Sequence, residues 1–130
     1  MTKFEHIKYW IDTAENDWQI VFKLFDSKDY LYSLFFSHLT IEKLTKAIWV
    51  KNNVENYPPK THNILYILEK GEFQLNDDQK DFLLTLNNFQ LEGRYPDYKQ
   101  NIYKICTKEY TETMIEKSKN FRECILKNLQ

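Results

Sequence analysis

A stripe of apolar residues over segment 2–25 constrains the fold of this chain most. Its members recur in alternating steps of three and four, at Phe4, Ile7, Ile11, Ala14, Trp18, Val21 and Phe25. Such steps keep side chains on one face of an α-helix. Thr2 and Glu5 have the T-x-x-E spacing of a capping box, which begins a helix. The pattern predicts a long amphipathic helix that must bury this stripe against other elements.

Segment 30–51 is predicted to form a second long helix, with Ser27 or Asp29 as its N-cap. One face of this helix is apolar, with Leu34, Ile41, Leu44 and Ile48. The adjacent face changes from apolar to polar in its middle, with Leu31, Phe35, His38, Glu42, Thr45 and Trp49. The helix therefore has one clear core face and a second face whose environment the pattern leaves open.

Shorter helices are predicted further along the chain. Thr61 is expected to cap a helix over 62–70, which Gly71 would end. Asn76 and Gln79 predict the start of a helix over 77–92. Pro96 disfavours helical geometry at the residue before it, so this helix should stop near Arg94. Segment 97–106 stays ambiguous, and Thr107 opens a last long helix to about residue 129.

The rarity of turn-forming residues supports an all-helical fold. The 130 residues include only two glycines and three prolines, too few for the many turns of a sandwich or barrel. Amphipathic helices joined by short loops pack as an antiparallel bundle. We therefore expect a single all-α domain over residues 1–130, built as an up-and-down bundle of four to five helices.

Charge and composition exclude several classes of function. Eighteen Lys and Arg against nineteen Asp and Glu give a net charge of −1, so a large basic surface for nucleic acid is not expected. Cys106 and Cys124 suit reduced thiols in a cytoplasmic protein. His6, His38 and His62 show no metal-ligand spacing, so no metal or other cofactor is expected. The sequence contains neither an N-terminal signal core nor a membrane-spanning window.

His38, Glu42 and Lys46 follow one another at steps of four residues, each about one helical turn. They must share a helix face and form a polar ladder. One interpretation is a solvated face with an ordinary ion pair. The other is a polar cleft between helices, where Glu42 would orient a base or hold a cation.

Two further residues are candidates for anion binding. His62 is expected at a helix N-terminus, where it is either a surface residue after a cap or a group beside a phosphate site. Arg94 precedes a Tyr-Pro pair; it either bonds the end of its helix or grips a phosphate from a rigid loop. The second arginine, Arg122, is expected to be a solvated charge.

Three stretches in this order resemble the HEPN domain family of prokaryotic helical domains. They are His38–Ala47 with Glu42, Lys43 and Lys46, then Lys60-Thr61-His62-Asn63-Ile64, and Gly93-Arg94-Tyr95-Pro96-Asp97. The resemblance covers essentially the whole chain. It implies a bundle of four or five helices, commonly a homodimer. Many family members are ribonucleases or toxins, others accompany a minimal nucleotidyltransferase, and nucleotide binding has been proposed.

The chain departs from the ribonuclease members at one point. Those members use an arginine followed, after four to six residues, by a histidine. Neither arginine here has that histidine: the corresponding positions are Lys99, Gln100 and Asn101, and then Lys127, Asn128 and Leu129. Metal-independent RNA cleavage is therefore not the first expectation.

The resemblance and the residues together favour a non-catalytic binding module. It would bind a nucleotide, RNA or a nucleotidyltransferase partner through Glu42, Lys43, Lys46, His62 and Arg94. One alternative is a ribonuclease or toxin of a toxin–antitoxin pair, with Arg94 and a relocated His62 as catalytic residues. The other is a structural homodimer without a ligand.

Overall fold

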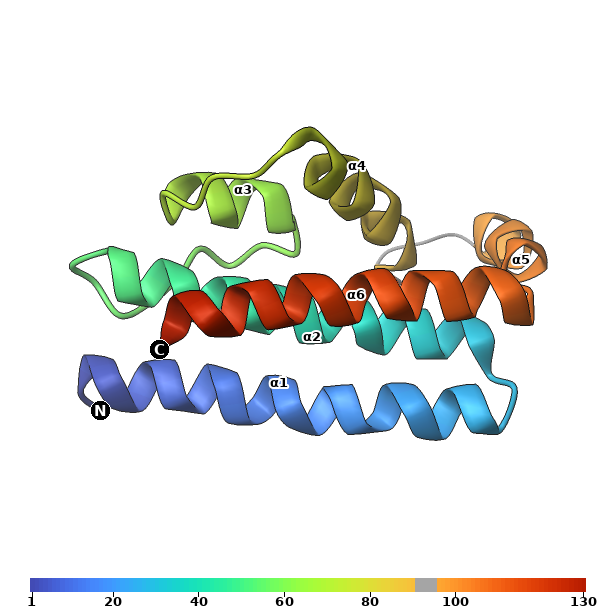
Figure 1. Ribbon diagram of the computed structural model, residues 1–130, viewed down its shortest axis with the longest axis horizontal. Helices are drawn as coiled ribbons and strands as arrows, with labels where there is room; N and C mark the ends of the chain where they lie inside the picture. Colours follow the sequence, from blue (N-terminus) through green and yellow to red (C-terminus); the bar gives the residue numbers. More distant parts are fainter. Residues whose placement is uncertain (91–95) are drawn as a thin grey trace.

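In the computed structural model, two long antiparallel helices form the base of the fold (Figure 1). The structure describes residues 1–90 and 96–130, which form six α-helices, one 3-10 turn and no strand. Helix α1 (Lys3–Asp26) leads through a short turn into α2 (Tyr30–Asn52). Thr2 caps α1 by accepting a hydrogen bond from the Glu5 amide at 3.1 Å, so the predicted start of this helix is confirmed.

Helix α2 is the centre of the bundle, since it packs against α1, α3 and α6. All four members of its predicted apolar face are buried: Leu34, Ile41, Leu44 and Ile48. Ala14, Trp18 and Val21 cover them from α1, and Met114, Phe121 and Ile125 belong to the same core. The first member of the α1 stripe, Phe4, is 74% exposed, contrary to expectation. The first turn of α1 contacts α2 through Lys3, which donates to the Val50 and Asn53 carbonyls.

Four helices follow the long pair. They are α3 (Ile64–Lys70), α4 (Asp77–Leu86) with the 3-10 turn η1 (Asn87–Phe89), α5 (Pro96–Ile105) and α6 (Lys108–Leu129). Asn76 and Gln79 form the predicted capping box, and Thr107 caps α6. Helix α6 ends beside the start of α1, so both termini lie at one end of the bundle (Figure 1).

Three predicted boundaries differ from the structure. Asn63, not Thr61, caps α3, by accepting from the Tyr66 amide at 3.2 Å. Helix α4 ends at Leu86, earlier than predicted, because Asn87 and Asn88 favour a tight turn over a continued helix. Most of the ambiguous segment 97–106 belongs to α5, which brings the number of α-helices in the described residues to six. Pro96 suits its first position, where no helical N–H bond is lost.

Gly71 ends α3 as predicted, and it also allows close packing. A Cβ atom at this position would lie 3.3 Å from the Trp49 Cα atom of α2 and 3.2 Å from the Ile67 carbonyl oxygen. The missing side chain therefore lets α3 approach α2. No helix among the described residues is long and apolar enough to cross a membrane.

Candidate functional site

Glu42 lies at the centre of the site, on a part of α2 that is enclosed by other elements. Glu42 is 3% exposed, and both His38 and Thr45 are fully buried. The interpretation of this ladder as a solvated helix face is therefore wrong. α2 is the central helix, so even its polar face is covered.

Three cationic or titratable side chains surround the Glu42 carboxylate. Lys46 donates to Oε2 at 3.1 Å, and the His62 Nδ1 atom lies 2.9 Å from Oε1. The His38 Nδ1 atom lies 3.9 Å from the same oxygen. We call these four residues the Glu42 cluster. Burial of a carboxylate without such partners would cost several kcal/mol of solvation, and these contacts offset that cost.

His62 connects the cluster to the surface. It lies in the loop over residues 53–63, just before α3, and its side chain remains 45% exposed. Pro58 and Pro59 restrict the loop, and the Thr61 amide donates to the Pro59 carbonyl at 3.0 Å. The loop thereby brings His62 to a residue twenty positions earlier in the chain.

The two lysines predicted as anion ligands differ in their surroundings. The Lys43 ammonium donates to Asp17 on α1 at 2.5 Å and ties the two long helices together. The Lys46 ammonium lies 5.2 Å from the centre of the Trp10 ring, besides its bond to Glu42. The structure therefore brings together Glu42, Lys46 and His62, and places Lys43 against a different carboxylate.

The two arginines have separate outcomes. Arg94 lies outside the described residues. Arg122 is not the solvated charge that the sequence indicated: its side chain is 19% exposed and pairs with Glu15. The guanidinium also lies 5.3 Å from the centre of the Trp18 ring. Arg122 therefore links α6 to α1 and is part of the fold.

Aromatic side chains beside the cluster were missed by the sequence analysis. His6 and Trp10 lie one turn apart on α1, and Tyr57 belongs to the same loop as His62. The His6 and Tyr57 rings meet edge to face, with centres 5.3 Å apart. The spacing of His6 and Trp10 was readable as a shared helix face, but the approach of Tyr57 depends on the path of the loop.

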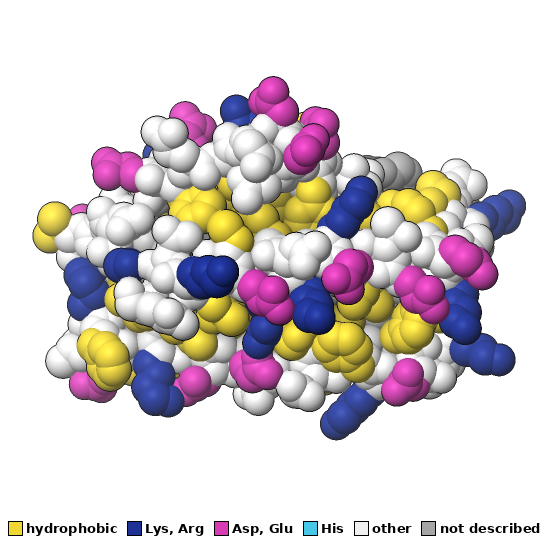
Figure 2. Space-filling model, viewed as in Figure 1, with side chains coloured by type: hydrophobic (Ala, Val, Ile, Leu, Met, Phe, Trp, Pro, Cys, Tyr) yellow, Lys and Arg dark blue, Asp and Glu magenta, His cyan; other side chains and the backbone are white. Residues whose placement is uncertain are grey.

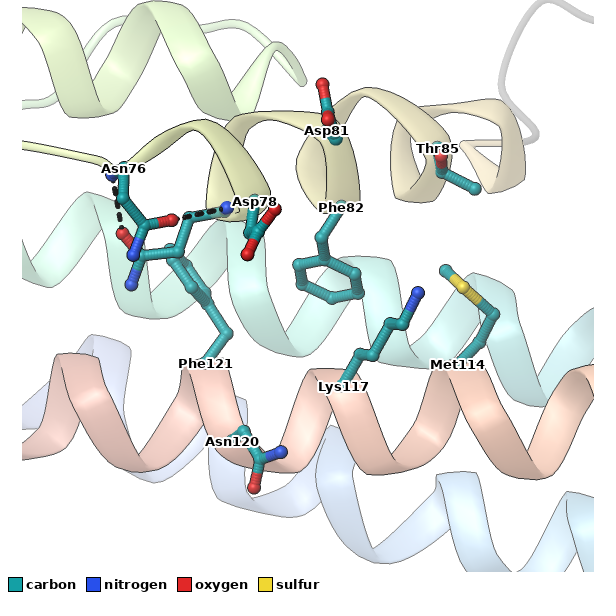
Figure 3. Close-up of a pocket in the computed structure, with 10 residues that line it drawn as sticks. Asn76, Asp78, Asp81, Phe82, Thr85, Met114, Lys117, Asn120 and Phe121 are labelled. Atoms are coloured by element: carbon teal, nitrogen blue, oxygen red, sulfur yellow. Dashed lines mark hydrogen bonds between the residues drawn. The ribbon is translucent and has the colours of Figure 1, made fainter.

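A hollow lies between α4 and α6, away from these residues. It has a volume of about 570 Å³, and none of the predicted site residues that the structure describes lines it. Figure 3 shows Phe82 pointing down from α4, while Met114, Lys117 and Phe121 point up from α6. We call it the α4–α6 groove.

The described residues contain no group of three or more His, Cys, Asp or Glu side chains that could hold a metal ion. The Glu42 cluster instead gathers one carboxylate, one lysine ammonium and two imidazole rings. Burial raises the pKa of the Cys106 thiol to about 11, which keeps this sulfur protonated at neutral pH.

Comparison with known proteins identifies the family. No curated protein and no solved structure matches the chain. The family model described as the HEPN domain matches residues 7–129, nearly the full length. The helical bundle and this match agree with the resemblance carried by the three motifs, and the chain belongs to the HEPN domain family.

Proposed function

We propose that this HEPN domain binds a nucleotide or RNA through Glu42, Lys46 and His62, with Arg94 as a further ligand for phosphate. The observation that carries the proposal is the Glu42 cluster itself. A carboxylate buried in the central helix is held between Lys46 and His62, while His62 stays half exposed. The buried ionic group thus reaches the surface, where a ligand can exchange with its internal partners.

Binding without cleavage is favoured by the sequence around the arginines. No histidine follows Arg94 or Arg122 at the spacing of the ribonuclease members. Lys43 has a supporting role in this proposal, because its bond to Asp17 holds α2 against α1 next to the cluster. A nucleotidyltransferase protein is the partner that the family suggests.

The test is a binding titration with the purified protein. Labelled single-stranded RNA, an RNA hairpin and mononucleotides are titrated with chelator present, for wild type and for the Lys46→Ala, His62→Ala and Arg94→Ala variants. Each variant should weaken binding about tenfold or more, as expected for lost bonds to a charged group. Lys117→Ala, which removes a lysine from the α4–α6 groove, is the matched control and should bind as wild type does.

Absence of binding to every one of these ligands would overturn the proposal. Co-expression with a nucleotidyltransferase encoded by an adjacent gene would then distinguish a partner-binding module from a structural dimer. A stable complex would favour a partner-binding module, and no complex would favour a ligand-free structural dimer.

RNA cleavage is a second candidate, and one contact favours it. The contact of Nδ1 with Glu42 orients the His62 ring, as a carboxylate does for a histidine that acts as general base. The same RNAs run on a denaturing gel would test this candidate. Products that disappear in both His62→Ala and Arg94→Ala would establish it in place of simple binding.

A further inference from the structure

Three aromatic side chains form a partly exposed group next to the Glu42 cluster. We call His6, Trp10 and Tyr57 the aromatic platform. Tyr57 is 75% exposed, although its ring is fixed edge to face against His6. His6 and Trp10 are half-buried on the same face of α1. An exposed tyrosine contributes little to a core, so its fixed orientation needs another explanation.

The platform and the cluster are joined at two places. Lys46 bonds Glu42 and also lies over the Trp10 ring, so one ammonium contacts both groups. Tyr57 and His62 are the ends of a six-residue stretch whose Pro58 and Pro59 stiffen the chain. This stretch therefore extends from the platform at one end to the cluster at the other.

One exposed lysine lies in the same loop as Tyr57. Lys60 is exposed in the same stretch, with no ion pair to any residue that the structure describes. Exposed aromatic rings beside an available cation are an arrangement by which proteins bind single strands: bases stack on individual rings and the cation contacts the phosphates. A duplex does not offer its base faces in this way.

We propose that the aromatic platform stacks unpaired bases of a single-stranded RNA whose phosphate lies near Lys60 and the Glu42 cluster. This inference rests on the proposed function and specifies its ligand. Base stacking then supplies affinity that does not depend on the RNA sequence, and the Glu42 cluster supplies contacts with the phosphate.

Substitution of Tyr57 tests the platform, because an exposed side chain can be changed without unfolding the protein. Tyr57→Ala should weaken binding of a single-stranded RNA about tenfold. Tyr57→Phe keeps the ring and should bind as wild type does. Tyr103→Ala removes a half-exposed tyrosine from α5, outside the platform, and should also leave the affinity unchanged. The wild-type protein should bind a fully paired duplex RNA more weakly than the single strand.

The outcomes separate this inference from the proposed function. If Lys46→Ala loses binding while Tyr57→Ala binds as wild type does, the platform is wrong and the proposed function stands. Equal affinity for single strand and duplex would also overturn the platform. A wild-type protein that binds mononucleotides but no RNA would overturn it as well, and one that binds no nucleotide or RNA would overturn both.

Discussion

The aromatic platform with its neighbouring Glu42 cluster and the α4–α6 groove both combine aromatic side chains with charged ones, and the charges differ. Beside the aromatic platform, the carboxylate of Glu42 is buried and paired with Lys46 and His62. In the α4–α6 groove, the apolar floor is bordered by Asp78 and Asp81. Figure 2 shows acidic side chains over α3 and α4 above a band of hydrophobic ones. The groove is a measurable hollow, but its lining carries two aspartates against one lysine, Lys117, which disfavours phosphate. The presence of a hollow therefore does not by itself identify a site for RNA.

The two surfaces also differ in what holds them together. The groove has an apolar floor, where the centres of the Phe82 and Phe121 rings lie 6.0 Å apart, and polar residues along its sides. The Glu42 cluster is held by buried ionic contacts, which lose much more when one partner is removed. Substitutions on the two surfaces should therefore separate stability from ligand binding.

Glu42→Ala should have the largest effect, because it leaves the Lys46 ammonium and His62 without their buried partner. The free energy of unfolding should fall by about 3–5 kcal/mol, measured by chemical denaturation. Glu42→Gln keeps the shape of the side chain and should lower the free energy of unfolding less than Glu42→Ala does. Glu116→Ala, on the exposed face of α6, is the control and should change stability by less than about 0.5 kcal/mol. Equal stability of Glu42→Ala and this control would contradict the account of the cluster.

Phe82→Ala should reduce stability by about 3 kcal/mol, because it removes a buried ring between α4 and α6. The folded fraction should keep the RNA affinity of wild type, which Glu42→Ala should not. Leu84→Ala changes an exposed residue of the same helix and should be close to neutral. Weakened RNA binding by folded Phe82→Ala protein would remove the distinction between the two surfaces.

The buried thiol of Cys106 should make the protein less stable to unfolding at alkaline pH, and this effect involves neither surface. Burial raises the pKa of this thiol from 9.0 to about 11, so the folded state retains a proton that the unfolded state releases. The stabilising contribution is complete below pH 9 and is lost as the pH rises towards 11. The Tm of Cys106→Ala should therefore fall less steeply over this range. Burial also raises the pKa of Tyr110, so Tyr110→Phe is measured beside it to separate the contribution of this second group. Equal slopes in wild type and both variants would contradict the prediction.

Arg122→Gln should have the smallest effect. It should lower the free energy of unfolding by about 1 kcal/mol at neutral pH, since Glu15 is partly exposed. Burial acts to raise the pKa of Glu15, but hydrogen bonds from Gln19 and Arg122 and the charge of Arg122 lower it overall. The stability from this pair is therefore present above the ordinary pKa of 4.5 and is lost as the pH falls through the lowered value. The difference between wild type and Arg122→Gln should shrink in acid, and a difference that grows there would contradict this sign.

The sequence predicted local features well because they depend on near neighbours. The caps at Thr2, Asn76 and Thr107 follow from spacings of three residues, and the ladder of His38, Glu42 and Lys46 follows from spacings of four. Whether that ladder faced solvent could not be predicted, because its burial depends on how α2 is covered by three other helices.

Contacts between segments far apart in the chain could not be predicted from the sequence for a related reason. The approach of His62 to Glu42 and of Tyr57 to His6 depends on the path of the loop over residues 53–63. The bond of Lys43 to Asp17, and of Arg122 to Glu15, depends on the rotation of packed helices about their axes. No pattern within one segment records these relations.

Photo-crosslinking tests the central claim most directly, namely that RNA binds beside the Glu42 cluster and not in the α4–α6 groove. A single-stranded RNA with photoreactive uridines is irradiated with the protein, and the crosslinked peptides are identified by mass spectrometry. The account predicts crosslinks within the first half of α1 and within the loop over residues 53–63, including Tyr57. Crosslinks confined to α4 and the facing part of α6 would contradict it.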